Sequence, residues 1–128
     1  MTRLTRLNPD SLHASPAFSQ GIAVAPGGTT VYVGGQNGTD STGVITGDIA
    51  AQTSQALRNV LAVLSAAGAG PEQVVRLTIH LAADADLPAA FAVTPAVWGA
   101  HPTTITVLRV TGFARPEALV EIDAIAVI

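Results

Sequence analysis

The chain has 128 residues, of which 48% are hydrophobic and only 12% are charged. A chain of this length fits one domain, so we expect a single domain over residues 1–128. The formal net charge of −3 and the lack of any basic run argue against nucleic acid as a partner. Because charged residues usually make up about 25% of a chain, the low charged fraction predicts that apolar surface is buried between subunits.

The residue types that are missing restrict the chemistry further. There is no cysteine and no lysine, which excludes disulfides, thiolate metal sites and a lysine Schiff base. His13, His80 and His101 are too scattered to predict a metal site. No apolar stretch is long enough to span a membrane, and residues 1–10 lack the apolar centre of a secretory signal. We therefore expect a cytoplasmic protein without a cofactor and without a membrane partner.

Three strands are predicted in the first third of the chain. Residues 2–7 alternate polar and apolar side chains, as an edge strand does, residues 19–24 form a second apolar run, and residues 29–33 are rich in β-branched side chains. The turn sequence at residues 25–28 predicts that the second and third strands form a hairpin.

A helical period follows. Leu57, Val60, Leu61 and Leu64 recur at helical spacing within residues 48–67, and Gly68 is placed to end this helix. Residues 74–81 then alternate as a strand, with Arg76, Thr78 and His80 on the face opposite Leu77, Ile79 and Leu81.

A second helix is predicted to begin at Asp86 and to carry Phe91 and Trp98, with a kink or an early end near Thr94 because Pro95 lies in its interior. Two further strands are predicted at residues 104–110 and 118–127. This order favours an α+β fold with a mixed sheet, in which two helices cover one face and a copy of the chain covers the other.

Five short motifs follow one another along the chain. They are Ser19-Gln20-Gly21, Val31-Tyr32-Val33-Gly34-Gly35-Gln36, Asp48-Ile49-Ala50-Ala51-Gln52-Thr53, Asn59-Val60-Leu61 and Leu119-Val120-Glu121-Ile122-Asp123-Ala124-Ile125-Ala126. By their order and spacing they resemble the RidA/YjgF (Rid) family over nearly the whole chain.

The resemblance implies a chorismate-mutase-like fold, with a mixed six-stranded sheet and two helices on one face. It also implies a homotrimer whose sheets form a barrel, with small-molecule clefts between subunits. Well-known members hydrolyse reactive enamines and imines to ketoacids and ammonia without metal or organic cofactor. Some relatives are recorded as ribonucleases or translation inhibitors, a role that the composition does not support here.

The resemblance also points to a missing cation. Imine deaminases of the family bind the substrate carboxylate with an arginine where this chain has Thr104, and a hydroxyl cannot replace a guanidinium. Arg109 lies on the opposite strand face by parity, and Arg115 on the following loop is an open alternative. Thr106 shares the face of Thr104, so the two threonines either line one cleft or are simply good strand formers.

Glu121 matches the glutamate that the family's deaminases use to orient or activate water. The alternative is a structural ion pair of Glu121 with Arg76 or Arg109. Asp123 shares its face and is expected at a barrel edge or interface. Gly35 and Gln36 match the family's loop that offers backbone N–H groups to a substrate oxygen, or else they only punctuate a turn.

Phe18 and Phe91 replace a tyrosine and an asparagine that are frequent in the deaminases. Together with Thr104, these losses of polarity predict a neutral or hydrophobic substrate, although either phenylalanine can equally be a core residue. His80 is a minor candidate acid or base. Two functions stay open: a cofactor-free hydrolase of imines or enamines with Glu121 as catalytic residue, and a catalytically silent trimer that binds a metabolite or regulates a partner.

Overall fold

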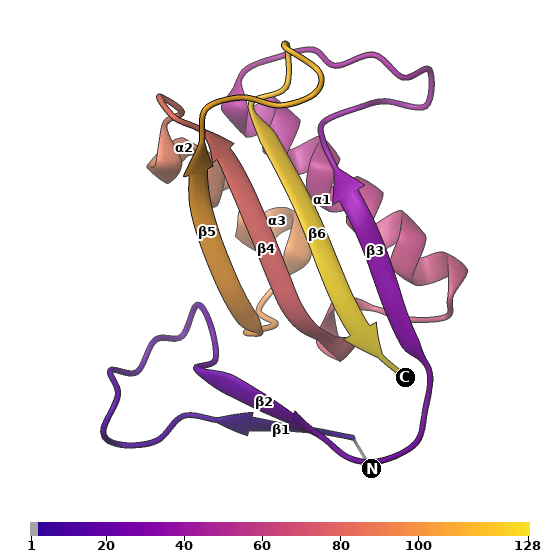
Figure 1. Cartoon of the computed structure of the whole chain (residues 1–128), viewed down its shortest axis with the longest axis vertical. Coiled ribbons are helices and arrows are strands. Elements are labelled where there is room, and N and C mark those ends of the chain that lie inside the picture. The colour runs from indigo at the N-terminus through magenta and orange to yellow at the C-terminus, as the bar shows by residue number, and fades with distance from the viewer. Residues whose placement is uncertain (1–2) are drawn as a thin grey trace.

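The computed structural model describes residues 3–128 and has six strands in two separate sheets (Figure 1). In chain order its elements are β1 (Leu4–Leu7), β2 (Gly21–Val24), β3 (Thr30–Gln36), α1 (Ile49–Ala66), the short 3-10 helix η1 (Pro71–Gln73), β4 (Val74–Ala82), α2 (Leu87–Ala92), α3 (Thr94–Trp98), β5 (Thr104–Val110) and β6 (Val120–Val127).

The larger sheet has the strand order β3-β6-β4-β5 and confirms the expected α+β fold with a mixed sheet. β4 and β5 are parallel, whereas β6 is antiparallel to both of its neighbours. The three helices lie together behind this sheet (Figure 1). The opposite face, which we call the open face, carries no helix of residues 3–128.

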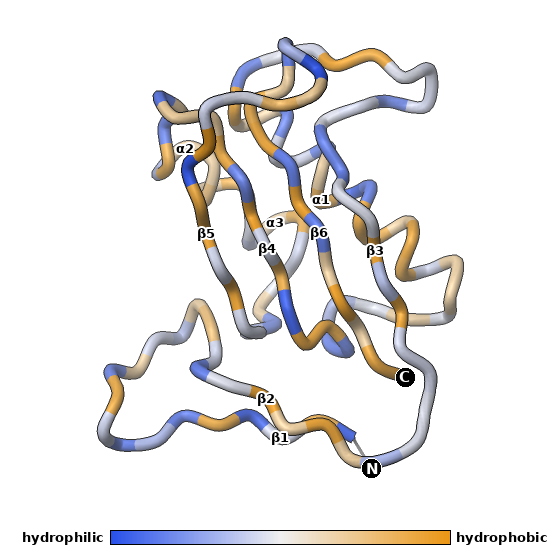
Figure 2. Tube along the Cα trace, viewed as in Figure 1, coloured by the Kyte–Doolittle hydropathy of each residue, from blue (hydrophilic) through white to orange (hydrophobic). Residues whose placement is uncertain are grey.

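The period of two along the strands decides what each face contains. Leu77, Leu81 and Ile122 are buried against the helices with the apolar side of α1, whereas His80 and Glu121 alternate with them and face the other way. Apolar and polar positions alternate along β4 and β6 in Figure 2. The open face therefore holds most of the chain's candidate polar groups.

Helix α1 begins and ends where the sequence predicts. The side chain of Asp48 accepts a hydrogen bond from the backbone N–H of Ala51 at 2.9 Å, which caps the first turn. Gly68 follows the helix with a φ of 76°, a conformation that glycine adopts without steric cost.

The predicted hairpin of residues 19–24 with residues 29–33 is wrong. β2 pairs with β1 in a two-stranded sheet of its own, and β3 pairs with β6. Gly27 and Gly28 both have positive φ and turn the chain away from β2, and the N–H of Thr29 then bonds to the carbonyl of Ile128 at 2.6 Å. The expected six-stranded sheet is therefore not present in this chain, which instead has a four-stranded sheet and a separate two-stranded hairpin.

The second predicted helix is present as two short ones. Asp86 caps α2 by accepting the N–H of Ala89 at 3.0 Å, as expected. The helix breaks at Val93, just before Pro95, because proline cannot continue the ladder of helical hydrogen bonds. No helix of the described part of the chain is long and apolar enough to cross a membrane.

Candidate functional site

Glu121 lies near the start of β6 on the open face, against the backbone of Gly35 on β3. A Cβ atom at Gly35 would lie 2.7 Å from Oε2 and 2.9 Å from Cδ of Glu121, so a side chain there would displace the carboxylate from this position. The pairing of β3 with β6 is irregular between Val33 and Gln36, the stretch that contains Gly34 and Gly35. Such irregularities are frequent beside active sites, where they redirect a strand.

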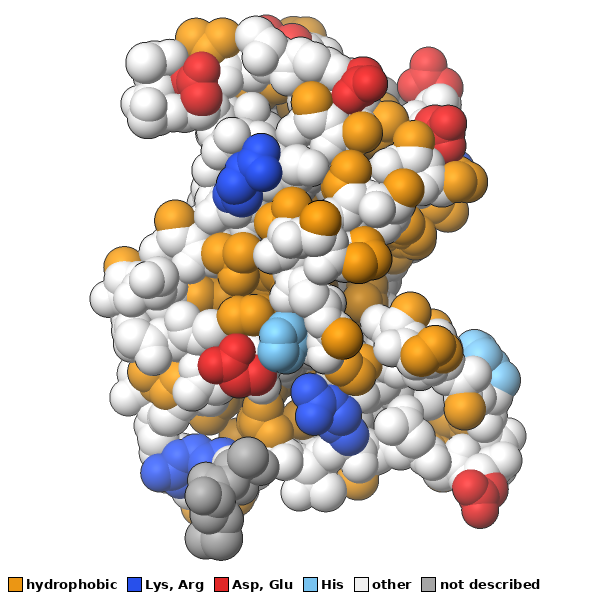
Figure 3. Space-filling view, turned by 180° about the vertical axis from the view of Figure 1, so that it is seen from behind, with side chains coloured by type: hydrophobic (Ala, Val, Ile, Leu, Met, Phe, Trp, Pro, Cys, Tyr) orange, Lys and Arg blue, Asp and Glu red, His pale blue; other side chains and the backbone are white. Residues whose placement is uncertain are grey.

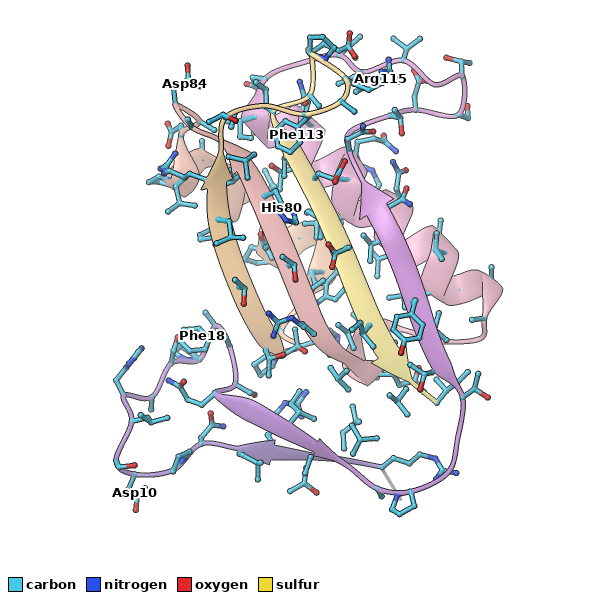
Figure 4. The ribbon with its side chains drawn as sticks, viewed as in Figure 1. Asp10, Phe18, His80, Asp84, Phe113 and Arg115 are labelled. Atoms are coloured by element: carbon cyan, nitrogen blue, oxygen red, sulfur yellow. The ribbon has the colours of Figure 1, made fainter. Side chains whose placement is uncertain are left out.

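His80 is the neighbour of Glu121 on the other side. The two residues are cross-strand partners of β4 and β6, which places their Cβ atoms about 5 Å apart. Nδ1 of His80 lies 3.2 Å from the backbone carbonyl oxygen of Glu121. A carbonyl oxygen only accepts, so Nδ1 carries the proton and Nε2 is left free to exchange one. His80 projects from β4 on the open face (Figure 4).

Neither arginine named as an alternative partner of Glu121 binds it. Arg76 donates to the hydroxyl of Thr106 at 2.9 Å, and Arg109 donates to the carbonyls of Ala83 and Ala85. In the described chain the one ion pair is Arg115 with Glu117. The carboxylate of Glu121 is therefore available to a small molecule.

Thr104 and Thr106 share the open face with Glu121, as predicted from parity, but they lie two strands away, on β5. The hydroxyl of Thr104 donates to the carbonyl of Val75, and Thr106 accepts from Arg76. β4 separates β5 from β6 by a lateral distance of about 10 Å. Thr106 and Thr104 also lie two and four residues along the sheet from the level of Glu121. One chain does not bring the threonines and Glu121 into one small cleft.

Arg115 does not fold back to Thr104. Its guanidinium bonds to Glu117 Oε1 and to the carbonyl of Gly43, both at 2.8 Å. Thr104 begins β5 and Arg115 follows its far end, near the loop after β3 (Figure 4). The cation on the open face nearest to Thr104 is Arg76, its cross-strand partner on β4.

Two amides that sequence reasoning did not single out, the buried Gln52 and the half-buried Asn59, hold the loops around Glu121. Asn59 donates to the carbonyls of Asn37 and Thr39 at 3.1 and 2.9 Å, which fixes the chain just after Gln36. Gln52 accepts from the N–H of Leu119 at 2.8 Å, at the entry to β6. Both residues stand within the quoted motifs, and an amide on the sheet-facing side of an apolar helix is the signal that could have identified them.

The loop after Asn37 contains a charged turn. Oδ1 of Asp40 accepts from the hydroxyl and N–H of Thr42 and from the N–H of Val44. The hydrogen bond from the Thr42 hydroxyl is the largest cause that lowers the pKa of Asp40 below its usual value. The ionised Asp40 therefore orders the turn whose Gly43 carbonyl binds Arg115.

Phe18 and Phe91 lie on the opposite side of the sheet from Glu121. Both line an apolar cavity of about 650 Å³ together with Leu77 and Ile105, whose side chains point toward the helices. The helix side of the molecule presents many apolar side chains and a hollow beside them (Figure 3). Within one chain the predicted site is thus split: Gly35, Gln36 and Glu121 lie together, Thr104 and Thr106 lie further along the open face, and the phenylalanines lie behind it.

The chain matches known proteins over almost its full length. The model of the family described as Endoribonuclease L-PSP matches residues 8–128. The Rid family protein YyfB from Yersinia pestis is 30% identical and superposes with a TM-score of 0.88, with 99% of this chain and 100% of YyfB covered.

Two further structures support the same fold. An endoribonuclease L-PSP type protein from Entamoeba histolytica is 31% identical with a TM-score of 0.73, covering 98% of this chain and 99% of that one. RidA from an Antarctic Psychrobacter, 24% identical, has a TM-score of 0.73 and covers 90% of this chain and 97% of its own. No curated protein is similar enough in sequence to match. The chain therefore belongs to the Rid (YjgF) family, whose family model is described as Endoribonuclease L-PSP.

Proposed function

We propose that the chain is a cofactor-free hydrolase of imines or enamines, with Glu121 at its reaction centre and a neutral or hydrophobic substrate. The observation that carries this proposal is the carboxylate of Glu121, which lies against Gly35 on the open face without an arginine bound to it. A carboxylate in this state can accept a proton from water, which is the step that imine hydrolysis needs.

The reaction consumes one imine and one water and yields one carbonyl compound and one ammonia. Glu121 takes a proton from water while the C–O bond forms and the electrons of the C=N bond move to nitrogen, which takes a proton from protonated His80. The proton held by Glu121 then passes to the same nitrogen, and the C–N bond breaks as the hydroxyl group gives its proton to His80. Ammonia leaves, the carbonyl forms and both side chains return to their starting states.

His80 is the proposed proton donor to the departing nitrogen. It stands beside Glu121 with Nδ1 directed to the backbone, so Nε2 is the nitrogen that can deliver the proton. Imidazole is the most frequent general acid and base in enzymes. The backbone around Gly35 and Gln36 lies beside the carboxylate of Glu121, and we propose that its N–H groups orient the substrate.

The neutral substrate is proposed from the surroundings of Glu121. Arg76 is four residues along β4 from His80, a backbone distance of about 13 Å, and is bound to Thr106. Without a guanidinium beside Glu121, a carboxylate on the substrate has no two-pronged partner there. The net charge of −3 likewise argues against RNA as substrate, despite the ribonuclease in the family's description.

A trimer would bring the separated parts of the site together. Both outer strands of the large sheet, β3 and β5, have an unpaired backbone edge, and Tyr32 on β3 is 75% exposed. Three copies that associate through these edges would place the threonines or phenylalanines of one copy against Glu121 of the next. The hairpin of β1 and β2 also supports this arrangement. It is too small to be stable without further packing, which a neighbouring copy would provide.

Ammonia release tests the proposal. The protein is mixed with imines generated freshly from neutral and from acidic amines, and ammonia is followed over time. We expect acceleration with the neutral imines. No acceleration with any of them would contradict catalysis and favour a silent trimer that binds a metabolite, and full activity on iminopyruvate would contradict the neutral substrate.

A further inference from the structure

We propose that the cavity between the β1–β2 hairpin and the large sheet binds a small molecule that carries a phosphate or carboxylate group. The hairpin crosses below the end of the sheet at which β6 ends (Figure 1). Val127, in the wall of this cavity, lies six residues along β6 from Glu121, a backbone distance of about 20 Å. The site is therefore separate from the proposed reaction centre, and it does not rest on imine hydrolysis.

The cavity exists because the hairpin is tied to the sheet along one side. The N–H of Ser19 donates to the carbonyl of Thr103 at 2.9 Å, and Nε of Arg6 donates to the carbonyl of Pro102 at 2.8 Å. Leu4 and Arg6 share one face of β1 by the period of two, and both line the cavity. The opposite wall comes from η1, from residues 100–102 and from the end of β6, and the enclosed volume is about 540 Å³.

The charged groups of the cavity are mainly basic. Arg3, Arg6 and His101 line it, and Glu72 is its one acidic residue. The carboxylate of Glu72 is turned back to Gly70, where an added Cβ atom would lie 2.7 Å from both of its oxygens. Within residues 3–128 no ion pair involves either of these arginines or Glu72. Figure 3 shows positively charged side chains and a histidine gathered at the same end of the molecule. The cavity therefore carries positive charge that an anion can neutralise.

Several hydrogen-bond donors of the wall remain available. The bond to Pro102 uses only Nε of Arg6, so both terminal nitrogens of the guanidinium can donate to a ligand. A guanidinium fork of this kind matches the paired oxygens of a carboxylate or phosphate. Oε1 of Gln73 accepts the N–H of Gly70 at 2.8 Å, which leaves the NH₂ group of that amide as a further donor.

The rest of the wall suits an apolar body next to the anionic group. Leu4, Pro102 and Val127 line the cavity, and its volume falls in the range of small-molecule sites. A ligand held by Arg6 and Gln73 would connect the hairpin to the large sheet. Phe18, Phe91, Thr104, Thr106 and Glu121, the residues of the predicted substrate cleft, do not line this cavity.

Calorimetry with three matched probes tests the site. Phenyl phosphate and benzoate carry the two kinds of anionic group on the same ring, and phenol is the neutral counterpart. In a buffer without phosphate, we expect at least one of the two anions to bind one to one at millimolar concentration or below. Phenol should bind at least about tenfold more weakly, because it cannot form the charge-assisted hydrogen bonds. The tighter of the two anions identifies the anionic group that the cavity prefers.

Two substitutions in the wall should change the affinity in opposite directions. Arg6→Gln should weaken binding of the anion at least about tenfold, whereas Arg58→Gln removes the same charge from the exposed side of α1 and should leave binding unchanged. Arg6→Gln also removes the bond to Pro102, so a second variant is needed. Glu72→Gln removes the one acidic residue of the cavity and should tighten binding about threefold, a gain that damage to the fold cannot produce.

The outcomes distinguish this site from the proposed hydrolase. The site would be overturned if neither anion binds, if phenol binds as tightly as the anions, or if Arg6→Gln and Arg58→Gln weaken binding equally. An unchanged affinity in Glu72→Gln would also contradict it. Ammonia release by Arg6→Gln should equal that of the original protein, and anion binding without any ammonia release would sustain this inference and not the proposed hydrolase.

Discussion

The carboxylate of Glu121 occupies the space that a side chain at Gly35 would fill, because a Cβ atom there would lie only 2.7 Å from Oε2. Gly35→Ala should push the carboxylate away from β3 and reduce kcat for imine hydrolysis at least tenfold, since small misplacements of catalytic groups are costly. The measurement is the initial rate of ammonia release.

Gly34→Ala is the matched control for this substitution. No atom lies within 4 Å of the Cβ that it would add, so its rate should stay within twofold of the original protein. Equal losses in both variants would indicate a general effect of stiffening this strand instead of displacement of Glu121.

His80→Gln removes the imidazole from the side of Glu121 while keeping a polar side chain of similar length. If His80 protonates the departing nitrogen, its loss should lower kcat by about 10²-fold or more. The plot of kcat/KM against pH should also lose the limb that reports the general acid. A rate loss with an unchanged pH profile would assign His80 a structural role through its bond to the Glu121 carbonyl.

Local patterns predicted much of the fold. The helical spacing of Leu57, Val60 and Leu64, the start of the second helix at Asp86 and the break before Pro95 were all found in the structure, since each depends on neighbours within a few residues. The alternation of side chains along a strand also correctly predicted that Arg109 and Thr104 lie on opposite faces of β5.

Strand pairing and the assembly of the site depended on longer contacts. The turn after β2 contains Pro26, Gly27 and Gly28, which resembles a hairpin turn, yet the bond of Thr29 to Ile128 directs the chain to β6. The position of Phe18 behind the sheet could not be predicted either, because loop residues have no period that assigns them a face. Only the register of β6 with β4 places His80 beside Glu121.

Arg76→Gln tests the proposed neutral substrate. Arg76 is the cation bound to Thr106, remote from Glu121 within one chain. Turnover of neutral imines should change less than twofold, with KM and kcat both retained. A rise in KM confined to acidic imines would mean that Arg76 of one copy binds a substrate carboxylate, in place of the arginine absent at Thr104.

Asn59→Asp tests the support of the loop that follows Gln36. Aspartate keeps the shape of the side chain but cannot donate to the carbonyls of Asn37 and Thr39. We expect a loss of about 1–3 kcal/mol in the free energy of unfolding, measured with urea. Arg58→Ala on the exposed side of the same helix should cost much less, and an equal loss would refute the role of the amide.

Glu121→Gln tests the central claim most directly, because the amide keeps the size of the side chain and cannot take a proton from water. The comparison is with Asp123→Asn, which removes a carboxylate from the same face of β6 two residues further along. We predict that ammonia release from every accepted imine falls by about 10²-fold or more in Glu121→Gln and is largely retained in Asp123→Asn. Unchanged turnover in Glu121→Gln would contradict the account.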